Sequence, residues 1–255
     1  MTSWAALDQE LDLWHGAGQP PTFWWRDDDC TAPSPALDRL LALSETHAVP
    51  LHLAVIPARL SPDLASRLAA APLARTLQHG LAHVNHEPNG YGASEMGAHR
   101  PVADIQRDLI AGREMIARAG LSKSLAAFAA PWNRIGPATL PVLAALGYRL
   151  VSRSGPRATR HPAPGLTELN IHVDPIRWKD GAQFRGEAKT LHNLIEHLQQ
   201  KRLGEVDPTE ATGLNTHHLQ TDAPTWTFLE RLMQVLAPPR GQWLCLDDVL
   251  AADHG

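Results

Sequence analysis

The chain alternates short apolar runs with stretches in which apolar residues recur every three to four positions. Short runs rich in aliphatic, aromatic or β-branched residues are typical of buried strands, and the wider spacing is typical of amphipathic helices. Strands are predicted at 22–25, 50–56, 76–78, 125–130, 148–152, 166–173, 211–216 and 242–246. Helices are predicted at about 3–15, from Ser34, from Ser61, from Pro101 to Gly120, and at 137–146, 187–203 and 226–236.

Capping residues support these boundaries, since Ser34-Pro35 is a typical helix start and Gly120 a typical helix stop. Neither a repeat nor a linker interrupts the order of elements. Seven or eight strand–helix units therefore predict a single α/β domain over residues 1–255, with a core from about 20 to 250. The predicted architecture is a (β/α) barrel, complete or distorted. A doubly wound open sheet is the alternative, because periodicity does not report whether a sheet closes.

Composition narrows the class of protein. Hydrophobic residues make up 44% and charged residues 20% of the 255 positions, as in ordinary globular proteins, which excludes a disordered chain. A net charge of −4 argues against a nucleic-acid partner. We find no apolar run of the roughly 20 residues that a membrane span needs, and no basic secretory signal. With only two cysteines, the expected location is the cytoplasm. The oligomeric state stays open.

Polar side chains with catalytic potential follow the predicted strands. This placement matters because barrel enzymes carry their functional groups at the carboxyl ends of strands. With 14 histidines, about 0.8 pairs at spacing i,i+4 are expected by chance, whereas three consecutive aspartates are expected only about 0.06 times. The candidates are Asp27 to Asp29, then His79, His83 and His86, then Pro131 to Arg134, then His172 and Asp174, and finally His217 and His218.

One carboxylate and two imidazoles form a three-ligand set for Zn²⁺ or a related divalent ion, with positions left open for water and substrate. A second aspartate beside the ion could take a proton from water, and a histidine on the opposite side could protonate a leaving group. Adjacent aspartates suit this division, because neighbouring residues at a strand end point in different directions. The pattern predicts metal-dependent hydrolysis.

These motifs, in this order, resemble the polysaccharide deacetylase family, also called the NodB-homology or carbohydrate esterase family 4 domain. The resemblance covers roughly residues 22–218 and implies a distorted barrel and metal-dependent removal of an N-acetyl or O-acetyl group. The residues that carry it are Arg26 to Asp29, His79 to His83, Phe128 to Asn133, Asp174 to Trp178, and Leu214 to His218.

The resemblance implies a role for each position. Asp29, His79 and His83 would bind the metal, most simply zinc, with cobalt, nickel or manganese as alternatives. Asp28 would be the catalytic base and His217 the catalytic acid, while Trp132 would offer a backbone N–H to the oxyanion. The pair Asp27/Asp28 is the alternative to Asp28/Asp29, and His218 is the alternative to His217. Substrate contacts are predicted for Asp27, His86, Asn133, Arg134, Asp174, Trp178 and His218.

Two departures from the family pattern stand out. The arginine that positions the base in the family corresponds to Ala129 here, and Arg134 or Arg26 could replace it. The glycine after the aspartate pair is Cys30, which we interpret as a packed residue rather than a ligand.

The leading prediction is an enzyme that deacetylates a saccharide or another small amide. The alternative is a non-catalytic protein that binds a saccharide or small molecule on the same barrel. A metal-free lyase or isomerase is a third reading, in which the clustering of Asp and His is coincidental.

Overall fold

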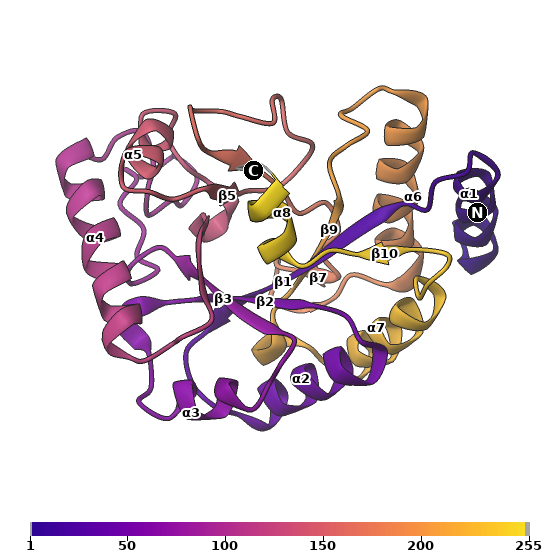
Figure 1. Ribbon diagram of the computed structural model, residues 1–255, viewed down its shortest axis with the longest axis horizontal. Coiled ribbons are helices and arrows are strands. Elements are labelled where there is room, and N and C mark those ends of the chain that lie inside the picture. The colour runs from indigo at the N-terminus through magenta and orange to yellow at the C-terminus, as the bar shows by residue number, and fades with distance from the viewer. Residues whose placement is uncertain (1, 253–255) are drawn as a thin grey trace.

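The strands lie side by side in a curved parallel sheet, with helices around its outside (Figure 1). The computed structural model describes residues 2–252. Within them, eight strands join in the order β10-β1-β2-β3-β4-β5-β6, with β9 paired to β1. These strands are β1 (Thr22–Cys30), β2 (Leu51–Val55), β3 (Ala74–His79), β4 (Ser124–Ala129), β5 (Leu150–Ser152), β6 (Thr167–Glu168), β9 (Thr212–Thr216) and β10 (Gln242–Trp243).

The helices match the predicted ones closely, because their apolar faces and caps are strong local signals. Ser34 caps its helix through its side chain, as predicted, and residues 187–203 form one helix over the predicted range. The helices are α1 (Trp4–Gly16), α2 (Pro35–His47), α3 (Leu64–Ala69), α4 (Val102–Arg118), α5 (Thr139–Ala145), α6 (Glu187–Leu203), α7 (Ala223–Val235) and α8 (Leu246–Ala252). Short 3-10 turns follow three strands: η1 (Pro57–Arg59), η2 (Pro131–Asn133) and η3 (His218–Gln220).

The sheet closes on itself through isolated bridges rather than a continuous ladder. Beyond β6 the chain continues extended, and Ile171 bridges Ser154 while Val173 bridges Leu214 next to β1. This contact between the 166–173 segment and β9 makes the architecture a distorted barrel, as predicted, rather than an open doubly wound sheet. Only Thr167–Glu168 of the predicted strand has regular ladder pairing.

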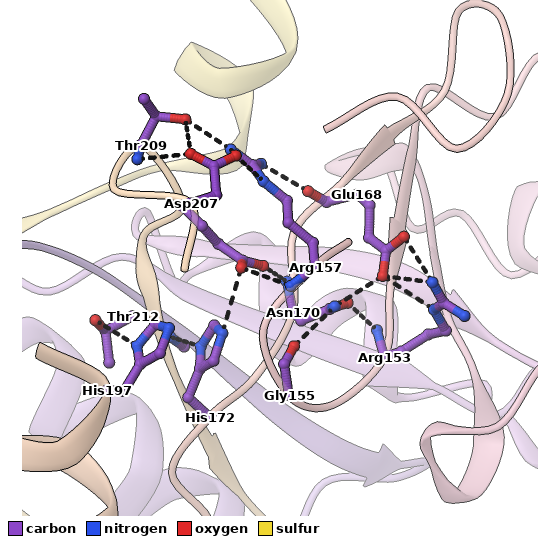
Figure 2. A network of polar contacts seen from close by, with 12 residues as sticks. Arg153, Gly155, Arg157, Glu168, Asn170, His172, His197, Asp207, Thr209 and Thr212 are labelled. Atoms are coloured by element: carbon purple, nitrogen blue, oxygen red, sulfur yellow. Dashed lines mark hydrogen bonds and ion pairs between the residues drawn. The ribbon is translucent and has the colours of Figure 1, made fainter. Parts of the chain in front are cut away.

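A buried polar network occupies the place where the ladder is incomplete (Figure 2). The Glu210 carboxylate accepts backbone N–H bonds from Arg157 and Asn170, and the Arg157 guanidinium donates to the Glu168 carbonyl at 2.8 Å. Backbone groups without strand partners are thereby satisfied by side chains, which a buried segment requires.

Three further element predictions need correction, and one hairpin was not predicted. The aspartates 27–29 do not follow the first strand but belong to it, because β1 extends to Cys30, with an irregularity in its pairing to β2 between Asp27 and Cys30. The helix predicted from Ser61 begins at Leu64. The strand predicted at 242–246 ends at Trp243, since Leu246 already begins α8. A hairpin of β7 (Ile176–Arg177) and β8 (Gln183–Phe184) has no signal in the periodicity, because each strand has only two residues.

Large aromatic residues of β1 pack on both faces of the sheet: Trp24 joins the cluster of Ala54, Leu77 and other strand residues, and Trp25 joins the cluster formed with the helices. The Trp24 and Trp25 side chains are fully buried, and each indole N–H has a partner, the Asn170 carbonyl at 2.9 Å and the Thr216 hydroxyl at 3.0 Å. Cys30 is also fully buried within the apolar core, as predicted for a packing residue. Among residues 2–252, no helix combines the length and apolar character that crossing a bilayer would require.

Candidate metal centre and catalytic site

The three consecutive aspartates at the end of β1 point to three different sets of partners. Asp29 leaves the regular strand conformation, with φ at 67°, and its Oδ1 lies 3.5 Å from Nε2 of both His79 and His83. Neither Asp27 nor Asp28 belongs to this cluster. The geometry therefore favours Asp29 over its neighbours as the carboxylate beside the histidines.

Local structure aims both imidazoles at Asp29. His79 ends β3, and its Nδ1–H donates to the Ala129 carbonyl on β4 at 3.1 Å, which leaves the Nε2 lone pair facing Asp29. A second hydrogen bond of this kind is the usual way in which proteins orient a metal-binding histidine. His83 follows on a tight turn, and its ring packs against Trp132 with centroids 4.0 Å apart.

The donor set fits a divalent cation. Asp29 Oδ1 is buried and has no hydrogen-bond partner, although a buried carboxylate oxygen normally has one. The three ligand atoms lie within 4.8 Å of one another, and one carboxylate with two imidazoles suits Zn²⁺ and related ions. Asp29, His79 and His83 are therefore the residues that would hold such an ion.

The charges of this cluster also shift its pKa values. Burial by itself would raise the pKa of Asp29, but the neighbouring His79 and His83 imidazoles lower it. Burial would lower the pKa of His79, but Asp28 and Asp29 raise it. For His83, burial and the neighbouring His79 lower the pKa. The two imidazoles therefore differ in their affinity for protons although they face the same carboxylate.

Asp28 lies beside the cluster in a separate, strongly held position. Arg26 contacts both of its oxygens, with Nε at 2.8 Å from Oδ1 and Nη2 at 2.9 Å from Oδ2. Asn215 Nδ2 also donates to Oδ2 at 3.1 Å. Burial would raise the pKa of Asp28, but the charges of Arg26, His79 and His217 lower it, so this carboxylate is ionised at neutral pH.

Arg26 is itself fixed from three sides. Its guanidinium is fully buried and donates to the Ser152 hydroxyl at 2.7 Å and to the Asn133 side-chain oxygen at 2.5 Å, in addition to Asp28. Arg26, and not position 129, thus supplies the arginine that contacts Asp28. Arg134 is exposed and reaches the Ala93 carbonyl at 3.4 Å instead, so it does not replace that arginine.

His217 faces Asp28 from the end of β9, the strand that pairs with β1. Its Nε2 lies 3.8 Å from Asp28 Oδ2, and its ring meets the Trp178 indole edge-on at 4.5 Å between centroids. The Trp178 N–H donates to Asp174 at 2.9 Å. Burial raises the pKa of Asp174, and the nearby His217 opposes that rise. Asp174, Trp178 and His217 therefore form one connected group.

Asp27 and His218 form a buried pair behind this group. Asp27 Oδ1 lies 2.5 Å from His218 Nδ1, and Asp27 Oδ2 accepts from the Thr216 hydroxyl at 2.7 Å and the His218 N–H at 2.9 Å. Both side chains are at most 1% exposed. This burial does not support the substrate contacts predicted for Asp27 and His218, and it leaves His217, not His218, facing Asp28.

The other residues predicted to contact substrate or the oxyanion lie either next to the Asp29–His79–His83 cluster or on the surface. Trp132, with φ at 53°, is partly exposed beside His83. The Asn133 side-chain oxygen accepts from Arg26, so Asn133 supports the arginine that contacts Asp28. His86 is exposed on the loop after β3, and its backbone N–H donates to the Ser94 carbonyl.

A second group of possible metal donors consists of His172, His197 and Glu210. The two histidines are labelled in Figure 2. The hydrogen bonding of His172 does not suit a ligand. Its Nδ1 accepts the Gly213 N–H at 3.0 Å, so in the neutral ring the proton is on Nε2, which faces Glu210 at 3.5 Å. His172, which the sequence offered as a candidate, is thus a core histidine.

Several residues of the site carry no usable sequence signal. Ser152 and Asn215 are common residue types in strands far from β1 along the chain. Glu95, buried under the turn that carries His83, lies in a loop with no motif. Only Arg26, next to the aspartates, stands within a recognisable pattern.

Comparison with known proteins identifies the fold. No protein-family model matches the chain, and no curated protein matches its sequence. A Mycobacterium smegmatis protein provisionally described as a polysaccharide deacetylase aligns at 18% identity over 85% of this chain and 76% of its own, with a TM-score of 0.61. A family 4 carbohydrate esterase from Streptomyces lividans in complex with acetate aligns at 16% identity over 88% and 91%, with a TM-score of 0.55.

Two further structures bear on the chemistry of this fold. A family 4 acetyl xylan esterase from Clostridium thermocellum, in complex with a cobalt ion, aligns at 11% identity over 91% of both chains, with a TM-score of 0.54. A family 4 pseudoenzyme from Bacillus anthracis aligns at 16% identity over 91% of this chain and 66% of its own, with a TM-score of 0.56. The fold of this protein is that of the polysaccharide deacetylases and family 4 carbohydrate esterases, as the motifs predicted.

Proposed function

We propose that this protein is a metal-dependent hydrolase that removes an acetyl group from an N-acetylated saccharide or a related small amide. The observation that carries the proposal is the arrangement of two facing groups. Asp28 and His217 lie 3.8 Å apart, beside the unpartnered Asp29 oxygen and the nitrogens of His79 and His83. The deacetylases and esterases that share the fold support the substrate class.

Asp29, His79 and His83 would hold the ion, most simply zinc, with cobalt, nickel or manganese as alternatives. When bound, such an ion would supply Lewis-acid polarisation of the substrate carbonyl and of the attacking water. The proton chemistry is then divided between Asp28 of β1 and His217, which follows β9.

Asp28 acts as the base in this proposal. Its depressed pKa keeps it ionised, and the two contacts from Arg26 fix the direction in which it accepts a proton from water. Attack of that water on the acetyl carbon produces a negatively charged oxygen, for which the backbone N–H of Trp132 is the proposed donor. His217 then gives a proton to the amine nitrogen as the C–N bond breaks, releasing acetate and the free amine.

Elemental analysis and an acetate-release assay test the proposal together. Wild type should contain about one equivalent of a divalent ion, and His79→Ala should lose it. Asp28→Asn should keep the ion but release acetate from N-acetylated chito-oligosaccharides at least about a hundred-fold more slowly, within the range for a general base. His86→Ala is the matched control for His79→Ala. His86 is exposed on the loop after β3, so this variant should keep the ion. A wild type that takes up no Zn²⁺, Co²⁺ or Ni²⁺ would refute the proposal.

The alternative is a binding protein that retains the barrel without the chemistry. The family 4 pseudoenzyme with the same fold favours it, as does the alanine at position 129. The Arg26–Asp28 pair opposes it, because the base is still held by an arginine. Saccharide binding by a metal-loaded protein that releases no acetate would favour this alternative.

A further inference from the structure

The turn that carries His83 surrounds a buried carboxylate. Glu95 comes from the loop between β3 and α4, twelve residues beyond His83, and its side chain is 1% exposed. Its Oε1 accepts the Ala82 N–H at 2.8 Å, and its Oε2 accepts the N–H groups of Leu81 and His83 at 3.2 Å each. Three successive backbone donors thus converge on one carboxylate.

The hydrogen bonds to Glu95 compensate for an unfavourable backbone conformation in the turn. Gly80 and His83 both have positive φ, at 62° and 57°, and the left-handed region costs a non-glycine residue about 1 kcal/mol. Successive N–H groups in such a turn form a concave site for an anion. Charge-assisted hydrogen bonds to Glu95 offset the backbone cost and leave the turn in one conformation.

The Glu95 carboxylate occupies the space next to Gly80. A Cβ built on Gly80 would lie 1.8 Å from Glu95 Oε2, so any side chain at position 80 would displace it. The His-Gly-Leu-Ala-His sequence offers no side-chain hydroxyl or amide between its histidines, so the turn has no hydrogen-bonding side chain of its own. Glu95, from a distant part of the loop, supplies the hydrogen-bonding side chain that these residues lack.

The backbone of Glu95 is held in place as well. Its backbone carbonyl accepts a hydrogen bond from the Arg100 side chain at 3.1 Å, and the next residue, Met96, forms a parallel β-bridge with Ile135. The carboxylate therefore extends from a fixed backbone rather than from a free loop.

We propose that Glu95 is a positioning residue that holds His83 in its metal-binding conformation and so strengthens metal binding. This inference rests on the metal site of the proposed function. It differs from the role of the ligands, because Glu95 acts through the backbone of the turn and does not contact the ion.

Metal affinity and the turn itself provide separate measurements. Co²⁺ binding to metal-free protein, followed by calorimetry and by visible absorption, should be about 10- to 100-fold weaker in Glu95→Ala than in wild type, the usual effect of losing an outer-shell partner. Glu95→Gln keeps the shape and part of the acceptor capacity, so it should fall between the two. In metal-free protein, amide hydrogen exchange of Leu81, Ala82 and His83 should accelerate in both variants.

Glu87→Gln is the matched control. Glu87 lies on the same loop but pairs with His99 instead of the turn, so its replacement should leave Co²⁺ affinity and the exchange of the three amides as in wild type. Glu95 variants that bind Co²⁺ like wild type would overturn the inference while leaving the proposed function intact. A wild type that binds no metal overturns both. Equal losses in the Glu87 and Glu95 variants would also overturn it, because they would indicate a general effect of the loop.

Discussion

Replacement of Arg26 tests how the candidate base is held. Arg26→Ala removes a fully buried guanidinium and leaves Asp28, itself 3% exposed, without its cationic partner. Breaking one side of a buried ion pair typically costs 3–5 kcal/mol. Because His79 and His217 still face Asp28, we expect the lower end of that range, a loss of about 3 kcal/mol in the free energy of unfolding.

A double-mutant cycle isolates the pair itself. Asp28→Asn alone leaves the Arg26 charge buried, although Ser152 and Asn133 still accept from it. Since the double variant removes both charges, it should be less destabilised than the sum of the single variants, with a coupling energy of about 2 kcal/mol. Arg67→Ala, which removes a partly exposed ion pair with Asp38, should cost less than about 1 kcal/mol and serves as the control.

Urea denaturation of metal-free protein at neutral pH measures all of these free energies. The sign of the pH dependence follows from the lowered pKa of Asp28. The stability that this carboxylate contributes is present above its unfolded pKa of about 3.9 and is lost as the pH falls through the lower folded value. A coupling energy under about 0.5 kcal/mol at pH 7, or an Arg26→Ala variant as stable as wild type, would refute this account of the pair.

Three other predictions concern stability, positioning and the metal. His52 is fully buried and held neutral, donating to the Trp25 carbonyl and accepting the Leu246 N–H, and burial lowers its pKa to about 4. Below pH 6.5 the unfolded chain protonates this histidine and the folded protein does not, so the free energy of unfolding should fall by about 3 kcal/mol between pH 6.5 and 4. Urea denaturation at several pH values should show that His52→Gln lacks this pH dependence. The same pH dependence in wild type and variant would contradict the prediction. Asp27→Asn should loosen the turn that presents His217, lowering the kcat of acetate release about ten-fold with little change in KM; a pure KM effect would argue for substrate contact instead. Chelation should abolish acetate release and added Zn²⁺ or Co²⁺ should restore it, whereas activity that survives full removal of metal would exclude the proposed chemistry.

The elements that sequence reasoning located well are those with strong local signals. The helix at 187–203 and the strands around 51–55 and 212–216 follow from apolar spacing and caps, which depend on neighbouring residues alone. The 166–173 segment was harder. Only two of its residues form a regular strand, because its backbone is satisfied by Glu210 and by isolated bridges that no spacing records.

In the candidate site, too, some features follow from local sequence and others only from the tertiary structure. The sequence alone predicted that one aspartate of the 27–29 triplet could share an ion with His79 and His83, because parallel strands bring their carboxyl ends to one edge and the motifs follow those ends. Only the tertiary structure decided how the three aspartates divide, since adjacent carboxylates are chemically alike until each meets its partner. Packing of β1 against β9 pairs Asp27 with His218, and packing across the sheet brings Ser152 to the Arg26 guanidinium that holds Asp28. These contacts join residues 191 and 126 positions apart in the chain, so they form only when the strands pack into the barrel, which no local pattern of residues encodes.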